Sequence, residues 1–199
     1  MRRAVLLAAL IVVVIAGAAI LRLADLGNRP MHCDEAVHAI KFGRLLEQDD
    51  YVYNPREYHG PSLNFLTLPI ARLASVQKLT RITEVHLRLL PAIFGIALVG
   101  LVWPLRDELG HVAVFCAAVL TAVSPAMVFY SRYYIQEMLL VCFTFVAMAA
   151  LWRYARPGGT GVSSGGTGVS PVHSQATPVW RPWAWLVVLG VSIGMMHAS

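Results

Sequence analysis

The stretch LLPAIFGIALVGLVWPL, residues 89–105, contains no charged residue. A hydrocarbon core about 30 Å thick needs about 20 helical residues, with a range of about 17–25. Four more uncharged runs accompany it, at residues 4–21, 112–131, 138–152 and 182–196. The sequence therefore predicts an all-α polytopic membrane protein. We expect spans at about 4–23, 88–105, 112–131 and 137–154, and a fifth that begins at 183.

The overall composition agrees with a membrane protein. Hydrophobic residues make up 57% of the 199 residues and charged residues only 14%, with a mean hydropathy of +0.62. A soluble domain of this length carries more charge. The formal net charge of +5 is explained by the loops between spans, because no basic run with interleaved aromatic residues is present. We therefore expect a lipid bilayer around the chain and no nucleic-acid partner.

The arginines of the short loops predict the orientation. Basic residues in short loops favour the cytoplasmic side, and one alternating topology places all of these arginines there: Arg2, Arg3, Arg106, Arg153, Arg156 and Arg181. We expect a multi-pass protein of the cell membrane with a cytoplasmic N-terminus. The long loop 24–87 is then outside, with one helix over 34–48 and a second over 61–76 that lies on the membrane surface.

The loop 156–182 has a different composition. The motif GGTGVS occurs at 158–163 and again at 165–170, and prolines follow. A phosphate-binding loop would need a preceding strand and usually a lysine, so we interpret 156–182 as a flexible cytoplasmic linker. The chain ends at the edge of an apolar run, and we expect it to be the N-terminal part of a longer protein and inactive alone.

Candidate catalytic acids lie at the ends of the apolar runs. Asp34 and Glu35 follow the first span, with His32 and His38 beside them. His38 is four residues after Asp34 and three after Glu35, so a helix would present it on the same face. Two other interpretations remain open for Asp34: the N-cap of the helix 34–48, or a metal ligand together with His32 and His38.

Glu137 is predicted to reach the same outer face at the start of the fourth span. It follows the segment Tyr130-Ser131-Arg132-Tyr133-Tyr134-Ile135-Gln136. Its tyrosines are typical of an aromatic belt at the interface, and Arg132 and Glu137 could form an ion pair. Ionisable residues at membrane depth are nevertheless costly and suggest function.

A series of motifs carries a family resemblance. In order, the chain contains MHCDEAVH (31–38), YHGPSL (58–63), LRLLPAIFG (87–95), SP (124–125), YSR (130–132) and Glu137. With these motifs in this order and spacing, the chain resembles GT-C membrane glycosyltransferases, in the branch of protein O-mannosyltransferases and lipid A aminoarabinose transferases. It is similar also to bacterial and archaeal membrane proteins associated with flippase or glycosylation loci. The resemblance covers residues 1–155 and resumes at about 183.

The resemblance implies roles for individual residues. Asp34 matches the family's catalytic base, Glu35 completes the acidic pair, and Glu137 matches the acid of the second outer loop. Arg132 matches a basic position near the lipid phosphate. The resemblance further suggests substrate-binding residues, for which the candidates are His38, His59 and Tyr133, with Gly60 standing where relatives commonly have proline.

The implied activity is an inverting glycosyl transfer on the outer face of the membrane. A polyprenyl-phosphate sugar is the expected donor, and the acceptor is a protein, a lipid or a glycan. A carboxylate accepts the acceptor's proton, and basic residues or a divalent cation, Mg²⁺ or Mn²⁺, stabilise the departing phosphate. The alternatives are a flippase or transporter component and a non-catalytic assembly protein. Acids at the ends of spans, rather than within them, favour the enzyme.

Overall fold

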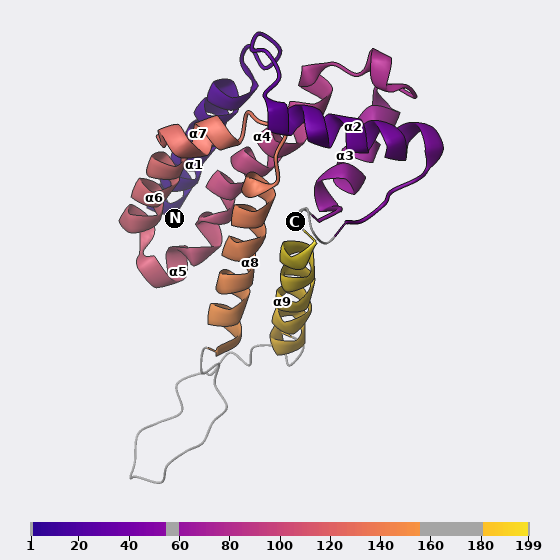
Figure 1. The fold of residues 1–199 in the computed structure, drawn as a ribbon. Helices are drawn as coiled ribbons and strands as arrows, with labels where there is room; N and C mark the ends of the chain where they lie inside the picture. Colours follow the sequence, from indigo (N-terminus) through magenta and orange to yellow (C-terminus); the bar gives the residue numbers. More distant parts are fainter. Residues whose placement is uncertain (1, 55–59, 156–180, 199) are drawn as a thin grey trace, which may run out of the picture.

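The computed structural model describes residues 2–54, 60–155 and 181–198, and within these ranges every regular element is a helix (Figure 1). This confirms the all-α prediction. The predicted linker 156–182 lies almost entirely outside the described residues, as does His59. In chain order the elements are α1 (Arg2–Leu23), α2 (Cys33–Gln48), α3 (Ser62–Leu73), η2 (Leu79–Arg81), α4 (Glu84–Leu101), η3 (Trp103–Leu105), α5 (Arg106–Leu109), α6 (His111–Val123), α7 (Pro125–Tyr130), α8 (Glu137–Ala155) and α9 (Arg181–His197).

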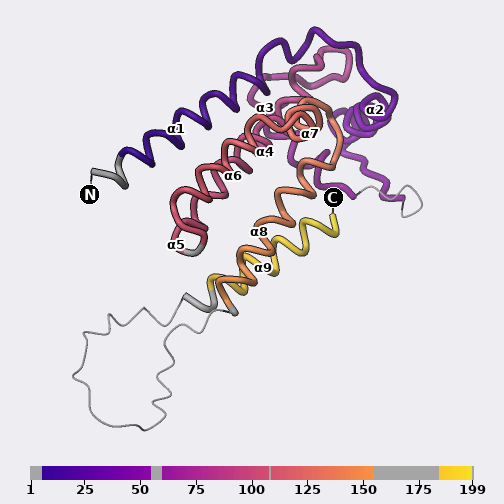
Figure 2. The backbone as a smooth tube through the Cα atoms, turned by 90° about the vertical axis from the view of Figure 1, so that its left-hand side faces the viewer, coloured from indigo at the N-terminus to yellow at the C-terminus, as the bar shows by residue number. Residues whose placement is uncertain are grey.

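Three of the described helical segments are long and apolar enough to cross a membrane: 6–23, 84–105 and 137–154. They correspond to the first, second and fourth predicted spans, so the chain is a multi-pass membrane protein. α6 and α9 are apolar but shorter, and the spans predicted there remain predictions. α1 packs against α4 and α6, and α8 packs against α9 (Figure 2).

The predicted span 112–131 is not one continuous helix. α6 ends at Val123 and α7 begins at Pro125. Proline has no N–H and its ring collides with the preceding turn, so the carbonyl of Thr121 loses its usual partner four residues on. The break leaves the last carbonyls of α6 to be satisfied from outside the helix.

Two arginines donate hydrogen bonds to backbone carbonyls at the ends of α6 and α1. Arg22, near the end of α1, is fully buried and donates to the carbonyls of Thr121 and Ala122, each at 3.0 Å. Arg132, beyond α7, donates to the carbonyls of Leu21 at 2.8 Å and Asp25 at 3.3 Å. A cation at a helix C-terminus meets both the free carbonyls and the negative end of the helix dipole. These contacts fix the end of α1 against α6 and the segment 131–136.

A small residue allows α4 to approach this junction. A Cβ atom at Gly95 would lie 2.5 Å from the Cβ of Ser131 and 3.0 Å from Nε of Arg22. Only glycine leaves space for both neighbours, since real Cβ atoms do not come so close. α4 therefore lies directly against the two segments that the arginines join.

The outer helices α2 and α3 pack on the end of this bundle, and Figure 1 shows α2 lying across it. Their common core is apolar, and its fully buried members include Phe42, Leu63, Leu87, Tyr134 and Leu139. Residues from α2, α3, α4 and α8 thus meet at one end of the molecule. This packing fixes the start of α2, where the candidate acids lie.

Candidate active site

Glu35 is the residue on which the outer loop converges. Its side chain is fully buried, and Arg88 donates from Nε to Oε1 at 2.8 Å and from Nη2 to Oε2 at 2.9 Å. The backbone N–H groups of His32 and Tyr134 donate to the same carboxylate at 3.0 and 2.9 Å. One carboxylate therefore joins α2, α4 and the segment before α8.

The environment of Glu35 keeps it ionised. Burial by itself raises the pKa of the carboxyl. The hydrogen bond from Arg88, those from the backbone of His32 and Tyr134, and the charge of Arg88 outweigh burial, and the pKa lies below its ordinary value. A carboxylate held in this way is an anchor for the loop.

Arg88 also fixes the chain that leads from α1 to α2. Its side chain is buried, and Nη1 donates to the carbonyls of Leu26 and Arg29, both at 2.9 Å. Nη2 approaches the carbonyl of Pro30 at 3.3 Å. α4 begins at Glu84, four residues before the predicted span, so Arg88 lies one turn inside the helix. Arg88 was not among the predicted site residues, although a charge beside a long apolar run is the kind of signal that indicates a role.

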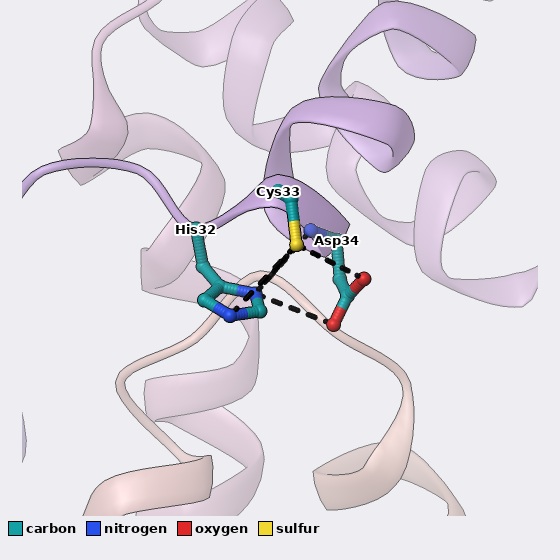
Figure 3. A group of neighbouring side chains, drawn as sticks. All are labelled: His32, Cys33 and Asp34. Carbon is teal, nitrogen blue, oxygen red and sulfur yellow. Dashed lines mark hydrogen bonds and ion pairs between the residues drawn. The ribbon is translucent and has the colours of Figure 1, made fainter.

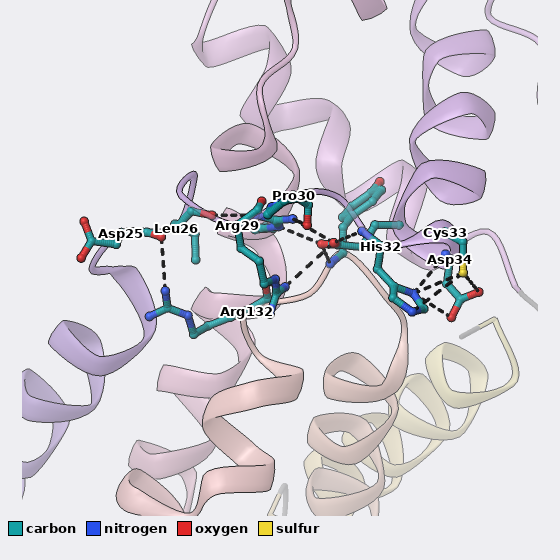
Figure 4. Close-up of polar contacts among 11 residues, drawn as sticks. Asp25, Leu26, Arg29, Pro30, His32, Cys33, Asp34 and Arg132 are labelled. Atoms are coloured by element: carbon teal, nitrogen blue, oxygen red, sulfur yellow. Dashed lines mark hydrogen bonds and ion pairs between the residues drawn. The ribbon is translucent and has the colours of Figure 1, made fainter.

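Arg29 connects the same loop to Tyr133. Its Cζ lies 3.4 Å from the centroid of the Tyr133 ring, a cation–π contact. Its Nη2 donates to the carbonyl of Arg132 at 3.1 Å and lies 3.9 Å from Oε2 of Glu35. Figure 4 follows these contacts along the loop from Asp25 to Asp34. Tyr133, a predicted substrate-binding residue, is thereby placed beside His32, at 6.1 Å between ring centroids.

Asp34 has surroundings opposite to those of Glu35. Its side chain is 69% exposed, and Oδ2 lies 3.3 Å from Nδ1 of His32. The alternative interpretation of Asp34 as the N-cap of the outer helix is wrong. His32 is the N-cap, with Nδ1 accepting from the Asp34 N–H at 3.3 Å, while Glu35 accepts from the His32 N–H to complete a capping box. The buried Glu35–Arg88 pair fixes Glu35 as the third residue of α2, and the side chain of Asp34, the second residue, is exposed.

His38 does not join Asp34. It is buried, with its ring edge-on to Tyr134 at 6.4 Å between centroids. The metal-binding interpretation with His32, Asp34 and His38 is therefore wrong, because the helix turns His38 towards the core. Tyr134 is itself fully buried, and its hydroxyl donates to Thr67 Oγ1 at 3.1 Å. It therefore belongs to the core and is no part of an aromatic belt.

Glu137 and Arg132 lie at the same end of the molecule but do not pair. Glu137 is exposed as the first residue of α8. Arg132 is turned towards the carbonyls at the end of α1. The Arg132–Glu137 ion pair, which the sequence left open, is therefore not formed, and Glu137 is exposed, as Asp34 is.

Among the described residues, one group of His, Cys, Asp and Glu side chains has the geometry to hold a metal ion: His32, Cys33 and Asp34, whose ligand atoms lie within 4.8 Å of one another. The group mixes imidazole, thiol and carboxylate. Mg²⁺ and Mn²⁺ prefer oxygen ligands. This donor set therefore differs from the one expected for Mg²⁺ or Mn²⁺, the cations that the sequence led us to expect.

Comparison with known proteins identifies the family. No curated protein matches the chain. The model of the dolichyl-phosphate-mannose-protein mannosyltransferase family matches residues 64–198, from α3 to the end of α9, and so includes Arg88, Arg132 and Glu137. Asp34 and Glu35 lie before the matched residues. The match covers more than half of the chain and confirms the resemblance to GT-C glycosyltransferases. With three membrane-spanning helices and this match, the chain belongs to the dolichyl-phosphate-mannose-protein mannosyltransferase family and is a membrane glycosyltransferase of the mannosyltransferase kind.

Proposed function

We propose that the protein transfers a sugar from a polyprenyl-phosphate donor to an acceptor at the outer face of the membrane, with Asp34 as the general base. The observation that carries this proposal is the contrast between two adjacent acids. Glu35 is fully buried and bound by Arg88, whereas the Asp34 side chain is 69% exposed. Neighbouring carboxylates in opposite environments can take separate roles.

Asp34 is the acid of the pair that a substrate can reach. A general base must come within hydrogen-bond distance of the proton that it accepts. Both oxygens of Glu35 already accept hydrogen bonds, from Arg88 and from two backbone N–H groups. We therefore assign Glu35 a positioning role, which revises the catalytic role expected for it. His38, which is buried against Tyr134, is assigned a supporting role instead of a substrate contact.

The chemistry is a displacement at the anomeric carbon. Asp34 accepts the proton of an acceptor hydroxyl, and the oxygen attacks the carbon from the side opposite the phosphate. The bond from carbon to phosphate oxygen breaks, the electron pair leaves with the phosphate, and the anomeric centre inverts. Charge develops on that phosphate, and a nearby cation stabilises it. Arg132, held at the end of α1 by Leu21 and Asp25, is our candidate for this cation.

We assign Glu137 a contact with the substrate. Its carboxylate is exposed at the start of α8, directly after the segment that bonds to Glu35 through the Tyr134 N–H. An exposed acid in this place is suited to binding sugar or acceptor hydroxyls. Side chains that contact the sugar and the acceptor determine which ones are used. In this part of the chain, Glu137 and Tyr133 are our candidates for such contacts.

The test is transfer from defined donors. Membranes with and without the intact protein are given radiolabelled mannose, linked either to polyprenyl phosphate or to a nucleotide. We expect protein-dependent labelling of an acceptor from the lipid-linked donor alone. Equal labelling in membranes that lack the protein, or direct transfer from the nucleotide sugar, would refute the proposal.

A further inference from the structure

The start of α2 presents three different metal-binding side chains in succession. Cys33 Sγ lies 3.5 Å from Nδ1 of His32 and 3.6 Å from Oδ1 of Asp34, and His32 Nδ1 lies 3.3 Å from Oδ2 of Asp34. All three residues are exposed. Figure 3 shows the side chains directed towards one another on the outer side of the helix start, with the sulfur between imidazole and carboxylate.

These separations are close to the ligand-to-ligand distances of a tetrahedral zinc site. Zinc lies about 2.3 Å from a thiolate sulfur and about 2.0–2.2 Å from imidazole nitrogen and carboxylate oxygen. With tetrahedral angles, these lengths place sulfur about 3.6 Å from nitrogen or oxygen, and nitrogen about 3.4 Å from oxygen. The observed 3.5 Å between sulfur and nitrogen agrees. The sulfur lies 3.6 Å from Oδ1 of Asp34 and the nitrogen 3.3 Å from Oδ2, so the two carboxylate oxygens are each at such a distance from one of the other ligands. With one ligand atom taken from each residue, the three atoms lie within 4.8 Å of one another.

The chemistry of the three groups selects the same ion. Thiolate and imidazole suit zinc, whereas magnesium and manganese prefer carboxylate and water oxygen. On binding, the Cys33 thiol gives its proton to solvent, and His32 Nδ1 exchanges the long contact from the Asp34 N–H for the metal.

We propose that His32, Cys33 and Asp34 form a binding site for Zn²⁺, with three protein ligands and a fourth position open to water. Binding places the Asp34 carboxylate on the ion, where it can no longer accept a proton. If Asp34 is the base, as the proposed function holds, zinc inhibits sugar transfer through this site. The inhibition rests on the proposed function, whereas metal binding does not.

Cobalt is the direct probe of binding. Co²⁺ titrated into the purified, detergent-solubilised intact protein is expected to bind at one equivalent, give the absorption of a cobalt–thiolate bond, and be displaced by Zn²⁺. Cys33→Ala removes the thiolate. His32→Asn removes the imidazole but keeps a strong N-cap residue, so α2 still forms. Each variant should weaken Co²⁺ binding by at least about 10-fold, because loss of even an outer-shell partner costs about 10–100-fold.

The matched control is Cys116→Ala, which removes a different exposed cysteine, on α6. It should bind Co²⁺ like the wild type. Wild-type protein that gives no cobalt–thiolate absorption, or equal binding by wild type and Cys33→Ala, would overturn the site.

A second measurement separates the two proposals. The ratio of sugar transfer with and without added Zn²⁺ should fall in the wild type and in Cys116→Ala, recover with a chelator, and stay near one in Cys33→Ala. Cobalt binding together with zinc-insensitive wild-type transfer would overturn the inhibition. Normal transfer by Asp34→Asn would overturn the proposed function and leave the binding result intact.

Discussion

At the scale of the residue, the neighbouring acids Asp34 and Glu35 differ in what surrounds them. Glu35 is removed from water together with Arg88, and each fills hydrogen-bonding positions of the other. Burying a charge is tolerated only where such a partner is present. The Glu35–Arg88 pair therefore holds the start of α2 in place and so positions the adjacent, exposed Asp34.

Removing one member of this pair should destabilise the protein. We expect Glu35→Gln to lower the free energy of unfolding by about 3–5 kcal/mol, because the Arg88 charge stays buried without its counter-ion. Thermal unfolding of the detergent-solubilised protein measures the loss. Asp34→Asn is the matched control and should change stability by no more than about 1 kcal/mol, the scale of one charge near a helix end. A Glu35→Gln protein that is as stable as wild type but inactive would instead favour a catalytic Glu35.

At the scale of the element, the junction of α1, α4 and α6 depends on close approach. Arg22 donates to carbonyls at the end of α6, and Arg132 donates to carbonyls at the end of α1. Gly95 on α4 leaves space for Arg22 and for Ser131, the residue before Arg132. The outer segment 131–136, which supplies Tyr133, Tyr134 and the N–H that binds Glu35, begins at this junction. The position of this segment therefore depends on the contacts that Arg22, Arg132 and Gly95 make at the junction.

A methyl group at Gly95 should disturb this junction. We expect Gly95→Ala to cost about 1–3 kcal/mol of stability through overpacking, with a reduced thermal midpoint in detergent. Gly190→Ala is the control, because a Cβ there meets no neighbour within 4 Å and alanine favours the helix by up to about 1 kcal/mol. Equal stability of Gly95→Ala and Gly190→Ala would show that α4 does not need this close approach.

The sequence was a good guide to the elements and a poorer guide to their ends. The apolar runs and turn residues place α2, α3 and α8 within a few residues of their observed limits. The break at Pro125 was not predicted, because an uncharged run looks the same whether or not it is one helix. The interpretation of Asp34 as an N-cap, left open by the sequence, is wrong because the start of α2 at His32 depends on Arg88 of another helix. For the same reason, helical spacing could not show that His38 turns inward with Glu35.

At the scale of the whole molecule, the helix bundle has two ends, and a contact made by an arginine identifies each of them. Arg132 joins the end of α1 to the segment before α8, while Arg153, near the end of α8, donates to the carbonyl of Pro104 after α4. α4 and α8 therefore each run from the end that carries Asp34 to the other end. This arrangement agrees with alternating spans and with a shared face for Asp34 and Glu137.

Thiol labelling tests this topology. Cys33 is exposed on the face that we assign to the outside, so a membrane-impermeant thiol reagent should label it in intact cells. In a Cys33→Ala background, Asp107→Cys places a thiol between α4 and α6, at the opposite end, and should be labelled only after permeabilisation. The reverse pattern would place the acids on the cytoplasmic side.

The central claim is that Asp34 accepts the proton during sugar transfer, and Asp34→Asn tests it most directly. Asparagine keeps the shape of the side chain but removes the charge and the proton-accepting oxygen. We expect transfer from a polyprenyl-phosphate-linked sugar, measured in membranes at equal protein level, to fall by roughly 10²–10⁴-fold, while thermal stability stays within about 1 kcal/mol of wild type. Transfer near the wild-type rate by Asp34→Asn would contradict the account.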